Sequence, residues 1–183
     1  MDALLLNAGV GVNGSFASDI PLEDDLNLIA LNVTSIVHLA KLELPEMLAR
    51  GRGKILITSS IAALLPGPYY ATYAASKAFL LSFSEALHAE LKDKGITVTA
   101  LMPGATDTNF FDRAGMEDTK IGQAKKDDPA EVAEEGFRAM MDGKDSLVAG
   151  SLKNKLQSFS TRFLSEQQKA SIHGAQVKPS SAA

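Results

Sequence analysis

Hydrophobic and polar positions are arranged along the chain in blocks that predict strands and helices in turn. Short, mainly apolar runs, typical of strands buried in a parallel sheet, lie at 3–6, 54–58, 96–102 and 146–149. Longer stretches with the apolar spacing of a helix buried along one side lie at 21–49, 69–92, 129–141 and 152–164. Strands that alternate with helices predict an α/β fold, a doubly wound, Rossmann-like parallel sheet.

The first helical stretch places its apolar residues on one side, which we expect to pack against the sheet. These residues are Leu22, Leu26, Ile29, Val33, Ile36, Val37, Ala40, Leu44, Met47 and Leu48. Pro21 suits the start of this helix, and Asp128 followed by Pro129 suits the start of a later one. The polar segment 106–128 is long for a connection, which predicts a functional lid or a mobile segment.

The length and composition suit one globular domain. With 45% hydrophobic and 22% charged residues among 183, the chain has enough apolar side chains for a single core. It contains no internal repeat or linker. We assign residues 1–173 to one domain and expect the small, polar residues 174–183 to form a disordered tail.

Charge and residue types exclude several classes of function. The net charge is −4, and no basic cluster is interleaved with aromatic residues, so nucleic acid is not an expected partner. The chain has no cysteine, and its three histidines (His38, His88, His173) are scattered, so we predict no metal site and interpret them as surface or helix-face residues. We see neither a signal peptide nor an apolar run long enough to span a membrane, which predicts a cytoplasmic protein without a membrane partner.

Tyr73 and Lys77 form a candidate proton-handling pair on the second long helix, because side chains four apart lie one above the other. Free tyrosine and lysine have pKa values of about 10 and about 10.4, so neither alone is a useful acid or base near neutral pH. An ammonium group one turn away favours the phenolate, so we expect Lys77 to lower the pKa of Tyr73. The spacing alone is common, and it gains meaning only from the residues around it.

Three polar segments follow predicted strands: Asn7-Ala8-Gly9, Ser59-Ser60 and Pro103-Gly104. In a wound parallel sheet, ligands bind beyond the carboxyl ends of the strands. A hydroxyl at Ser60 would therefore hold a substrate oxygen in the same mouth as Tyr73. These independent signals predict one site at one edge of the sheet.

Together these motifs resemble the short-chain dehydrogenase/reductase family. The matching residues are Asn7-Ala8-Gly9, Asn32 in the first long helix, Ser60, Tyr73-x-x-x-Lys77, and Pro103-Gly104-Ala105-Thr106-Asp107-Thr108. Their order and separations are highly specific, and the resemblance covers about residues 1–150 well. It implies an oxidoreductase that transfers hydride between NAD or NADP and a small carbonyl or alcohol substrate.

The resemblance also implies a role for each matching residue. Tyr73 would be the general acid or base on the substrate oxygen, and Lys77 would lower its pKa and bind the nicotinamide ribose. Ser60 would hydrogen-bond the substrate oxygen, and Asn32 would position a water that links Lys77 to solvent. The implied cofactor-binding residues are Asn7, Ala8, Gly9, Tyr73, Lys77, Pro103, Gly104, Thr106 and Thr108, with the two threonines on the nicotinamide carboxamide.

Simpler interpretations of some residues stay open. Asn32 would equally suit a helix kink, and Ser59 rather than Ser60 could face the substrate. Either threonine of the Pro103–Thr108 loop could cap the next short helix. We favour Ser60 because the family places its serine thirteen residues before the tyrosine, which is the separation found here. Phe110-Phe111 would line the pocket and suggest a partly apolar substrate.

The chain departs from the family pattern at its start. Family members begin with a strand, a turn of the type Thr-Gly-x-x-x-Gly-x-Gly, a helix and further strand–helix units before the Asn-Ala-Gly segment. Residues 9–14 match G-x-G-x-x-G superficially, but they follow the family's fourth strand, and we interpret this as a false match. We therefore expect an N-terminally incomplete sheet that lacks the part binding the cofactor pyrophosphate.

Two other classes of function are weighed against this one. A catalytically silent fragment or pseudoenzyme would act through its helices alone, but intact Ser60, Tyr73 and Lys77 argue against it. A serine hydrolase is disfavoured because no G-x-S-x-G turn surrounds either serine. The helices at 21–49 and 69–92 resemble the family's dimerisation surface, which implies a homodimer or homotetramer.

Overall fold

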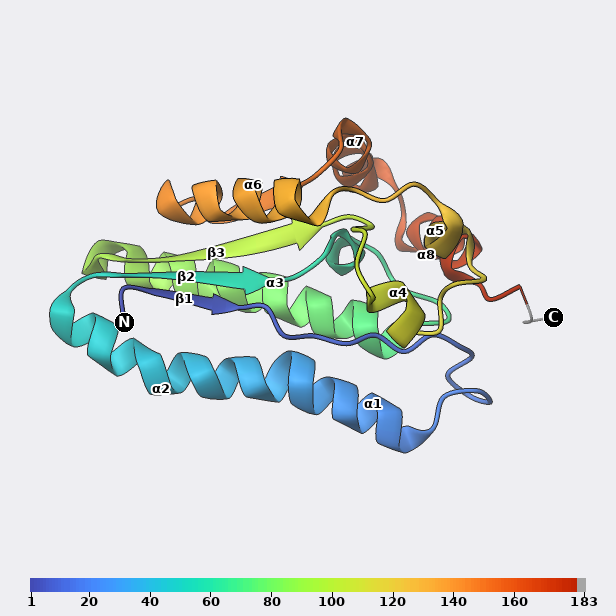
Figure 1. The fold of residues 1–183 in the computed structure, drawn as a ribbon, viewed down its shortest axis with the longest axis horizontal. Coiled ribbons are helices and arrows are strands. Elements are labelled where there is room, and N and C mark those ends of the chain that lie inside the picture. Colours follow the sequence, from blue (N-terminus) through green and yellow to red (C-terminus); the bar gives the residue numbers. More distant parts are fainter. Residues whose placement is uncertain (181–183) are drawn as a thin grey trace.

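The computed structural model describes residues 1–180, in which a parallel four-stranded sheet is covered by helices on both faces (Figure 1). The strands, β1 (Ala3–Leu6), β2 (Gly53–Thr58), β3 (Ile96–Pro103) and β4 (Ser146–Ala149), lie side by side in chain order. Leu4 is paired with Ile55, and Ile55 with Val98, so the carboxyl ends of the strands meet at one edge. The predicted α/β fold with a Rossmann-like parallel sheet is confirmed.

Eight α-helices of two kinds lie between and after the strands within the described residues. The long ones are α1 (Leu22–Ile29), α2 (Ser35–Arg50), α3 (Ala71–Leu91), α6 (Pro129–Met141), α7 (Leu152–Ser160) and α8 (Glu166–Val177). The single-turn helices α4 (Phe110–Arg113) and α5 (Lys120–Gln123) lie in the segment predicted to be irregular. The predicted strands and long helices are found to within a turn of their expected limits.

The alternation of side chains along the strands separates two of the three buried clusters, one on each face of the sheet. Ile55 and Ile57 face α2 and α3, whereas Leu56 between them faces α6. The first core contains Leu6, Ile36, Ala40, Met47, Ile55, Ile57, Leu80, Leu91, Ile96 and Val98. The second contains Leu56, Leu101, Val132, Met140 and Ala149. Two packed layers therefore hold the strand ends in place from both sides.

The long helix at residues 22–50 buries different residues than expected at its N-terminal half. Ile36, Ala40 and Met47 are buried as predicted, but Leu22 and Leu26 are 73% and 55% exposed. A π-helical turn at Ala30–Thr34 joins α1 to α2 and adds a residue to the turn, which rotates the two halves relative to each other. A pattern based on regular helical spacing could not locate this rotation.

The same helix bears on the membrane prediction. By length and composition alone, the described helix from Leu22 to Arg50 would suffice to cross a membrane, and 22% of its most apolar window is buried in the fold. The sequence-based exclusion of a spanning segment therefore does not hold on those two criteria. Ile36 and Met47 are fully buried against the sheet, as in the core helix of a folded domain. The cytoplasmic location stays a prediction.

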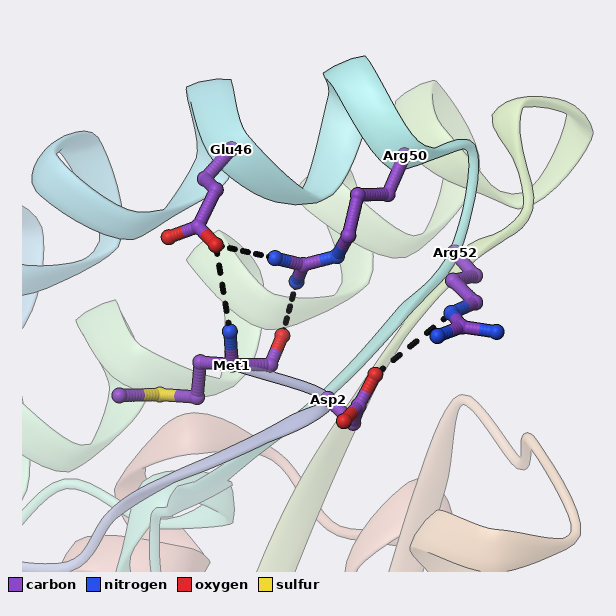
Figure 2. A network of polar contacts seen from close by, with 5 residues as sticks. All are labelled: Met1, Asp2, Glu46, Arg50 and Arg52. Carbon is purple, nitrogen blue, oxygen red and sulfur yellow. Dashed lines mark hydrogen bonds and ion pairs between the residues drawn. The ribbon is translucent and has the colours of Figure 1, made fainter.

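A polar network ties the start of β1 to the end of α2 and the start of β2 (Figure 2). Glu46 contacts both the amino group of Met1, at 3.4 Å, and the guanidinium of Arg50, which in turn donates to the Met1 carbonyl. Arg52 pairs with Asp2 at 3.5 Å. Because Glu46, Asp2 and Arg52 are largely exposed, solvent screens these pairs and they contribute little to stability.

The C-terminal part corrects one prediction. The tail expected to be disordered from residue 174 is helical as far as Val177, whose side chain is fully buried. Ser165 and Gln168 form a reciprocal capping box at the start of α8. The domain therefore extends past residue 173, and the part of the expected tail at 181–183 lies outside the described residues.

Candidate active site

A cavity of about 720 Å³ opens where the strands end. The loops after β1, β2 and β3 form one side, and residues of α5, α7 and α8 form the other. The expected site residues that line it are Asn7, Gly9, Ser60, Tyr73, Lys77, Pro103, Gly104, Thr106 and Thr108. Ala8 and Asn32 do not line it. The fold thus brings together all but two of the residues singled out in the sequence.

Tyr73 lies in the first turn of α3 and is only 7% exposed. Its ring stacks on Tyr70 with centroids 4.9 Å apart and lies 5.3 Å from Phe110. Burial raises the pKa of Tyr73 to about 12, and a hydrogen bond with Ser60 offsets only part of this effect. The phenol is therefore protonated near neutral pH and able to donate its proton.

Lys77 lies one turn further along α3 and is 4% exposed. Its Nζ donates to the carbonyl oxygen of Thr58 at 2.9 Å and lies 5.7 Å from the centre of the Tyr73 ring. Burial lowers the pKa of Lys77 to about 8. The expected lowering of the Tyr73 pKa is not met in this structure, because burial raises that pKa and disfavours the charged form of both groups.

The two neighbouring serines have different environments. Ser59 is 2% exposed, and its hydroxyl donates to the carbonyl oxygen of Lys77 at 2.7 Å, which anchors β2 to α3. Ser60 begins a short 3-10 turn, where its Oγ accepts from the backbone N–H of Ala62 at 3.1 Å and donates to the carbonyl oxygen of Pro103 at 3.4 Å. The Ser60 hydroxyl also lowers the pKa of Tyr73, which places the two groups beside each other. Of the two alternatives left open by the sequence, this geometry favours Ser60 as the hydroxyl beside Tyr73.

Asn32 is fully buried within the π-helical turn and holds three groups. Its Oδ1 accepts from the backbone N–H of Val10, and its Nδ2 donates to the carbonyl oxygen of Val10, both at 2.9 Å. The same Nδ2 lies 3.1 Å from the Ser76 hydroxyl. The side chain therefore fixes the loop after β1 against α3, and its proposed role in water positioning stays a prediction.

The loop after β3 is shaped by close packing against α7. A Cβ at Gly104 would lie 2.2 Å from Nδ2 of Asn154, so no larger residue fits there without a shift. Asn154 donates to Asp127 at 2.6 Å, and the backbone of Asp127 pairs with Asp107 and Thr106. The Pro103–Thr108 loop is thus held on both sides.

The two threonines of this loop make local bonds. Thr106 donates to the carbonyl oxygen of Gly104 at 3.1 Å. Thr108 accepts from the backbone N–H of Phe110 at 3.3 Å, the local capping contact that the sequence left open as an alternative. Both still line the cavity, so the local contacts do not remove them from it.

The structure adds cavity residues that sequence reasoning missed. His173 was interpreted as a surface or helix-face residue, yet it is 3% exposed, lines the cavity and lies edge-on to Tyr70 at 5.5 Å. Its Nδ1 lies 2.9 Å from the carbonyl oxygen of Pro66, and burial lowers the pKa of His173. The capping box at Ser165 and Gln168 is the sequence signal that could have revealed its helix.

The residues present fit a nicotinamide ribose. A Cβ at Gly9 would lie 3.2 Å from Nζ of Lys77, so glycine keeps that ammonium or amine group accessible from the cavity. Hydroxyl and backbone groups of the Pro103–Thr108 loop lie in the same cavity as Tyr73 and Ser60. A flat polar ring and a carbonyl or alcohol could therefore occupy neighbouring parts of it.

Comparison with known proteins gives a family match. Residues 1–118 match the model of the short chain dehydrogenase family. The chain is 35% identical over 148 residues to dehydrogenase/reductase SDR family member 7B of Rattus norvegicus, covering 76% of this chain and 45% of that protein. It is 49% identical over 82 residues to 17-beta-hydroxysteroid dehydrogenase type 3 of Mus musculus, covering 45% of this chain and 27% of that protein.

A third relative differs in its named substrate. The chain is 42% identical over 99 residues to very-long-chain 3-oxoacyl-CoA reductase of Anas platyrhynchos, covering 51% of this chain and 32% of that protein. The chain thus spans less than half the length of each of these three curated relatives.

Solved structures agree with the family match. A short-chain dehydrogenase from Sphingobium yanoikuyae in complex with NADPH is 26% identical, with a TM-score of 0.76 over 89% of this chain and 63% of that one. A 3-ketoacyl-(acyl-carrier-protein) reductase from Brucella melitensis complexed with NADH is also 26% identical, with a TM-score of 0.69 over 81% and 65%. On the match of the family model and of these folds, the chain belongs to the short-chain dehydrogenase family.

Proposed function

We propose that this chain carries the hydride-transfer part of an NAD- or NADP-dependent oxidoreductase site acting on a carbonyl or alcohol group. The observation that carries the proposal is the meeting of Ser60, Tyr73 and Lys77 in one cavity with the Pro103–Thr108 loop. The family match and the cofactor-bound relatives support it.

Proton transfer would be the task of Tyr73. When a carbonyl is reduced, its oxygen gains negative charge, and the phenol O–H of Tyr73 would donate its proton to that oxygen. An alkoxide is a far stronger base than a phenolate, so a tyrosine whose pKa is raised to about 12 still protonates it. In the reverse direction the phenolate of the same residue would accept the proton of an alcohol.

Ser60 and Lys77 would assist this proton transfer. Ser60, already hydrogen-bonded with Tyr73, would hold the substrate oxygen in line with the phenol. Lys77, with a pKa lowered to about 8, would hold the ribose hydroxyls through Nζ and would compensate for negative charge left on Tyr73. A bound nicotinamide would supply or accept the hydride at the neighbouring carbon.

The proposal is tested by the variant Tyr73→Phe, assayed with NADH and NADPH against a panel of apolar ketones while the absorbance of the reduced nicotinamide is followed. Loss of the acid should lower turnover at least about 100-fold, with nicotinamide affinity changed less than about threefold. Tyr69→Phe makes the same chemical change at a tyrosine that does not line the cavity, and it should keep its turnover. Comparable turnover in Tyr73→Phe and the unaltered chain would refute the assigned role.

We also propose a homo-oligomer that buries the outward side of the two long helices. Leu39 and Leu42 on α2 are 42% and 60% exposed, and Phe79 on α3 is 41% exposed. Apolar side chains gathered on neighbouring helices are typical of an interface between subunits. This proposal covers the assembly and not the chemistry of the cavity.

A further inference from the structure

Basic residues outnumber acidic residues around the cavity. Four basic residues line it besides Lys77: Arg113 of α4, Lys120 of α5, Lys125 shortly after α5, and Lys153 of α7. None of the four has a carboxylate within ion-pair distance in the described part of the chain. Figure 1 shows that α4, α5 and α7 gather at the end of the sheet where the strands terminate. These side chains surround the site from the side opposite the strands.

Most acidic residues of the same segment do not line the cavity. Asp107, Asp112 and Glu117 line a neighbouring hollow together with Lys126. The segment thus contributes three basic residues and one acidic residue to the main cavity.

The remaining acids of the segment have partners. Asp118 accepts from the backbone of Ser180 at 2.9 Å, and Asp128 caps α6 by accepting from Ala130 at 2.7 Å. Asp127, the one acid that lines the cavity, accepts from Asn154 at 2.6 Å. The basic rim is therefore not neutralised locally, in a chain whose net charge is −4.

We propose that this basic rim, Arg113, Lys120, Lys125 and Lys153, selects a carbonyl substrate that carries phosphate groups at a distance from the reacting carbon. Four unpaired cations exceed what one carboxylate would neutralise, whereas phosphate groups supply several charged oxygens each. Tyr70, Phe110 and Phe111 line the cavity closer to Tyr73 and would contact the apolar part that joins the two ends. The inference rests on the proposed oxidoreductase function and names the substrate class.

A matched pair of probes tests this directly. Acetoacetyl coenzyme A and acetoacetyl N-acetylcysteamine share the same reacting thioester, but only the first carries phosphates. Binding of each to the chain is measured calorimetrically without cofactor, and we expect the phosphorylated probe to bind about tenfold more tightly. High salt should reduce the difference, because exposed charges are screened within about 3 Å at 1 M ionic strength.

Charge-neutralising variants identify the rim as the source of the preference. In the double variant Lys120→Gln/Lys125→Gln, the tenfold preference for the phosphorylated probe should fall to about threefold or less. Its binding of the neutral thioester should be unchanged. Lys92→Gln/Lys94→Gln removes the same charge from exposed positions before β3, at the opposite end of the sheet, and should keep the full preference. The proposal would be overturned if both thioesters bound equally well, if neither bound, or if the rim variant kept an unchanged preference.

Two further arms separate this proposal from its alternatives. If saturating reduced nicotinamide mononucleotide abolished binding of the phosphorylated probe, the phosphates would occupy the cofactor's place and the assignment to substrate would fail. The preference should also persist in Tyr73→Phe, which lacks the acid. A retained preference without turnover in the unaltered chain would refute the proposed function alone, whereas equal turnover of both thioesters would refute the phosphate selection alone.

Discussion

Two long helices on the same face of the sheet differ in which side chains they bury: one buries polar residues and the other exposes apolar ones. In α3, Ser76, Lys77 and Ser84 are at most 4% exposed, although all three are polar. The helix at residues 22–50 instead exposes apolar side chains, with Leu22 at 73% and Leu42 at 60%. The two helices therefore differ in which kind of side chain they bury.

The difference follows from the partners that each helix finds. These three buried side chains of α3 all donate to backbone carbonyl oxygens. Ser76 donates to Tyr73 at 2.7 Å, Lys77 to Thr58 at 2.9 Å, and Ser84 to Leu80 at 2.7 Å. Burial of a polar group is tolerated when it is hydrogen-bonded. The comparison suggests that the chemistry lies where polar groups are buried and bonded, and assembly lies where apolar groups are exposed.

The largest expected effect comes from Asn32, which is fully buried in the helix at residues 22–50. Asn32→Leu removes both bonds to Val10 and the one to Ser76, which leaves buried backbone groups unsatisfied. We expect the free energy of unfolding to fall by about 3 kcal/mol. Chemical denaturation measures this change. Ser35→Ala on the same helix loses only a bond to the Leu31 carbonyl and serves as control; an equal loss in both variants would contradict the assignment.

The next effect is the pH dependence contributed by Lys77. Burial lowers its pKa from 10.5 to about 8, so between these values the unfolded chain holds a proton that the folded chain has lost. The free energy of unfolding should therefore rise with pH across this window, by about 3 kcal/mol, and this gain is lost as the pH falls from 10.5 to about 8. Denaturation of Lys77→Met at the same pH values should lack this rise. An identical pH profile in both proteins would show that Lys77 is not the group responsible.

A smaller effect separates two serines of α3. Ser76→Ala should lower the free energy of unfolding by about 1 kcal/mol, because Asn32 then loses one partner. Ser84→Ala should change it by less than about 0.5 kcal/mol, because the Ser84 hydroxyl bonds only to the Leu80 carbonyl of its own helix. Thermal or denaturant unfolding of both variants gives the comparison, and a larger loss at Ser84 would reverse the interpretation.

The smallest effect on stability is expected on the exposed side of α2. Leu39→Lys/Leu42→Lys should leave the unfolding of the single chain within about 0.5 kcal/mol, because neither residue is part of the core. The variant should nevertheless reduce self-association, which is measured by light scattering or analytical ultracentrifugation over a range of concentrations. Leu152→Lys, at an exposed leucine of α7, is the control for the added charge. Unaltered association would place the interface elsewhere.

Much of the fold could be predicted from the sequence because it depends on local patterns. The strand at 146–149 and the Asp128 cap with Pro129 are found where apolar runs and capping chemistry indicated them. The π-helical turn around Asn32 was not predicted, because its added residue depends on contacts with Val10 and Ser76, which are distant in the sequence. Helix α8 was missed because its pattern is weakly apolar despite its capping box.

The candidate site divides in the same way. The convergence of Ser60, Tyr73 and Pro103 follows from the rule that parallel strands end at one edge. The pKa of Tyr73 could not be inferred, because it depends on burial by Tyr70 and Phe110 and on the whole surrounding cavity. The position of His173 likewise depends on packing across the molecule.

The side-chain amide of Asn13 has a consequence for the order of folding. Its Nδ2 donates to the carbonyl oxygens of Tyr69, at 3.2 Å, and of Val177, at 3.0 Å, and the second contact is separated by 164 residues in sequence. Closure of so long a loop has a high entropic cost, so contacts of this kind form late. We therefore expect the sheet to assemble first and α8, which forms one wall of the cavity, to dock last. The ability to bind a ligand would then appear only at the end of folding.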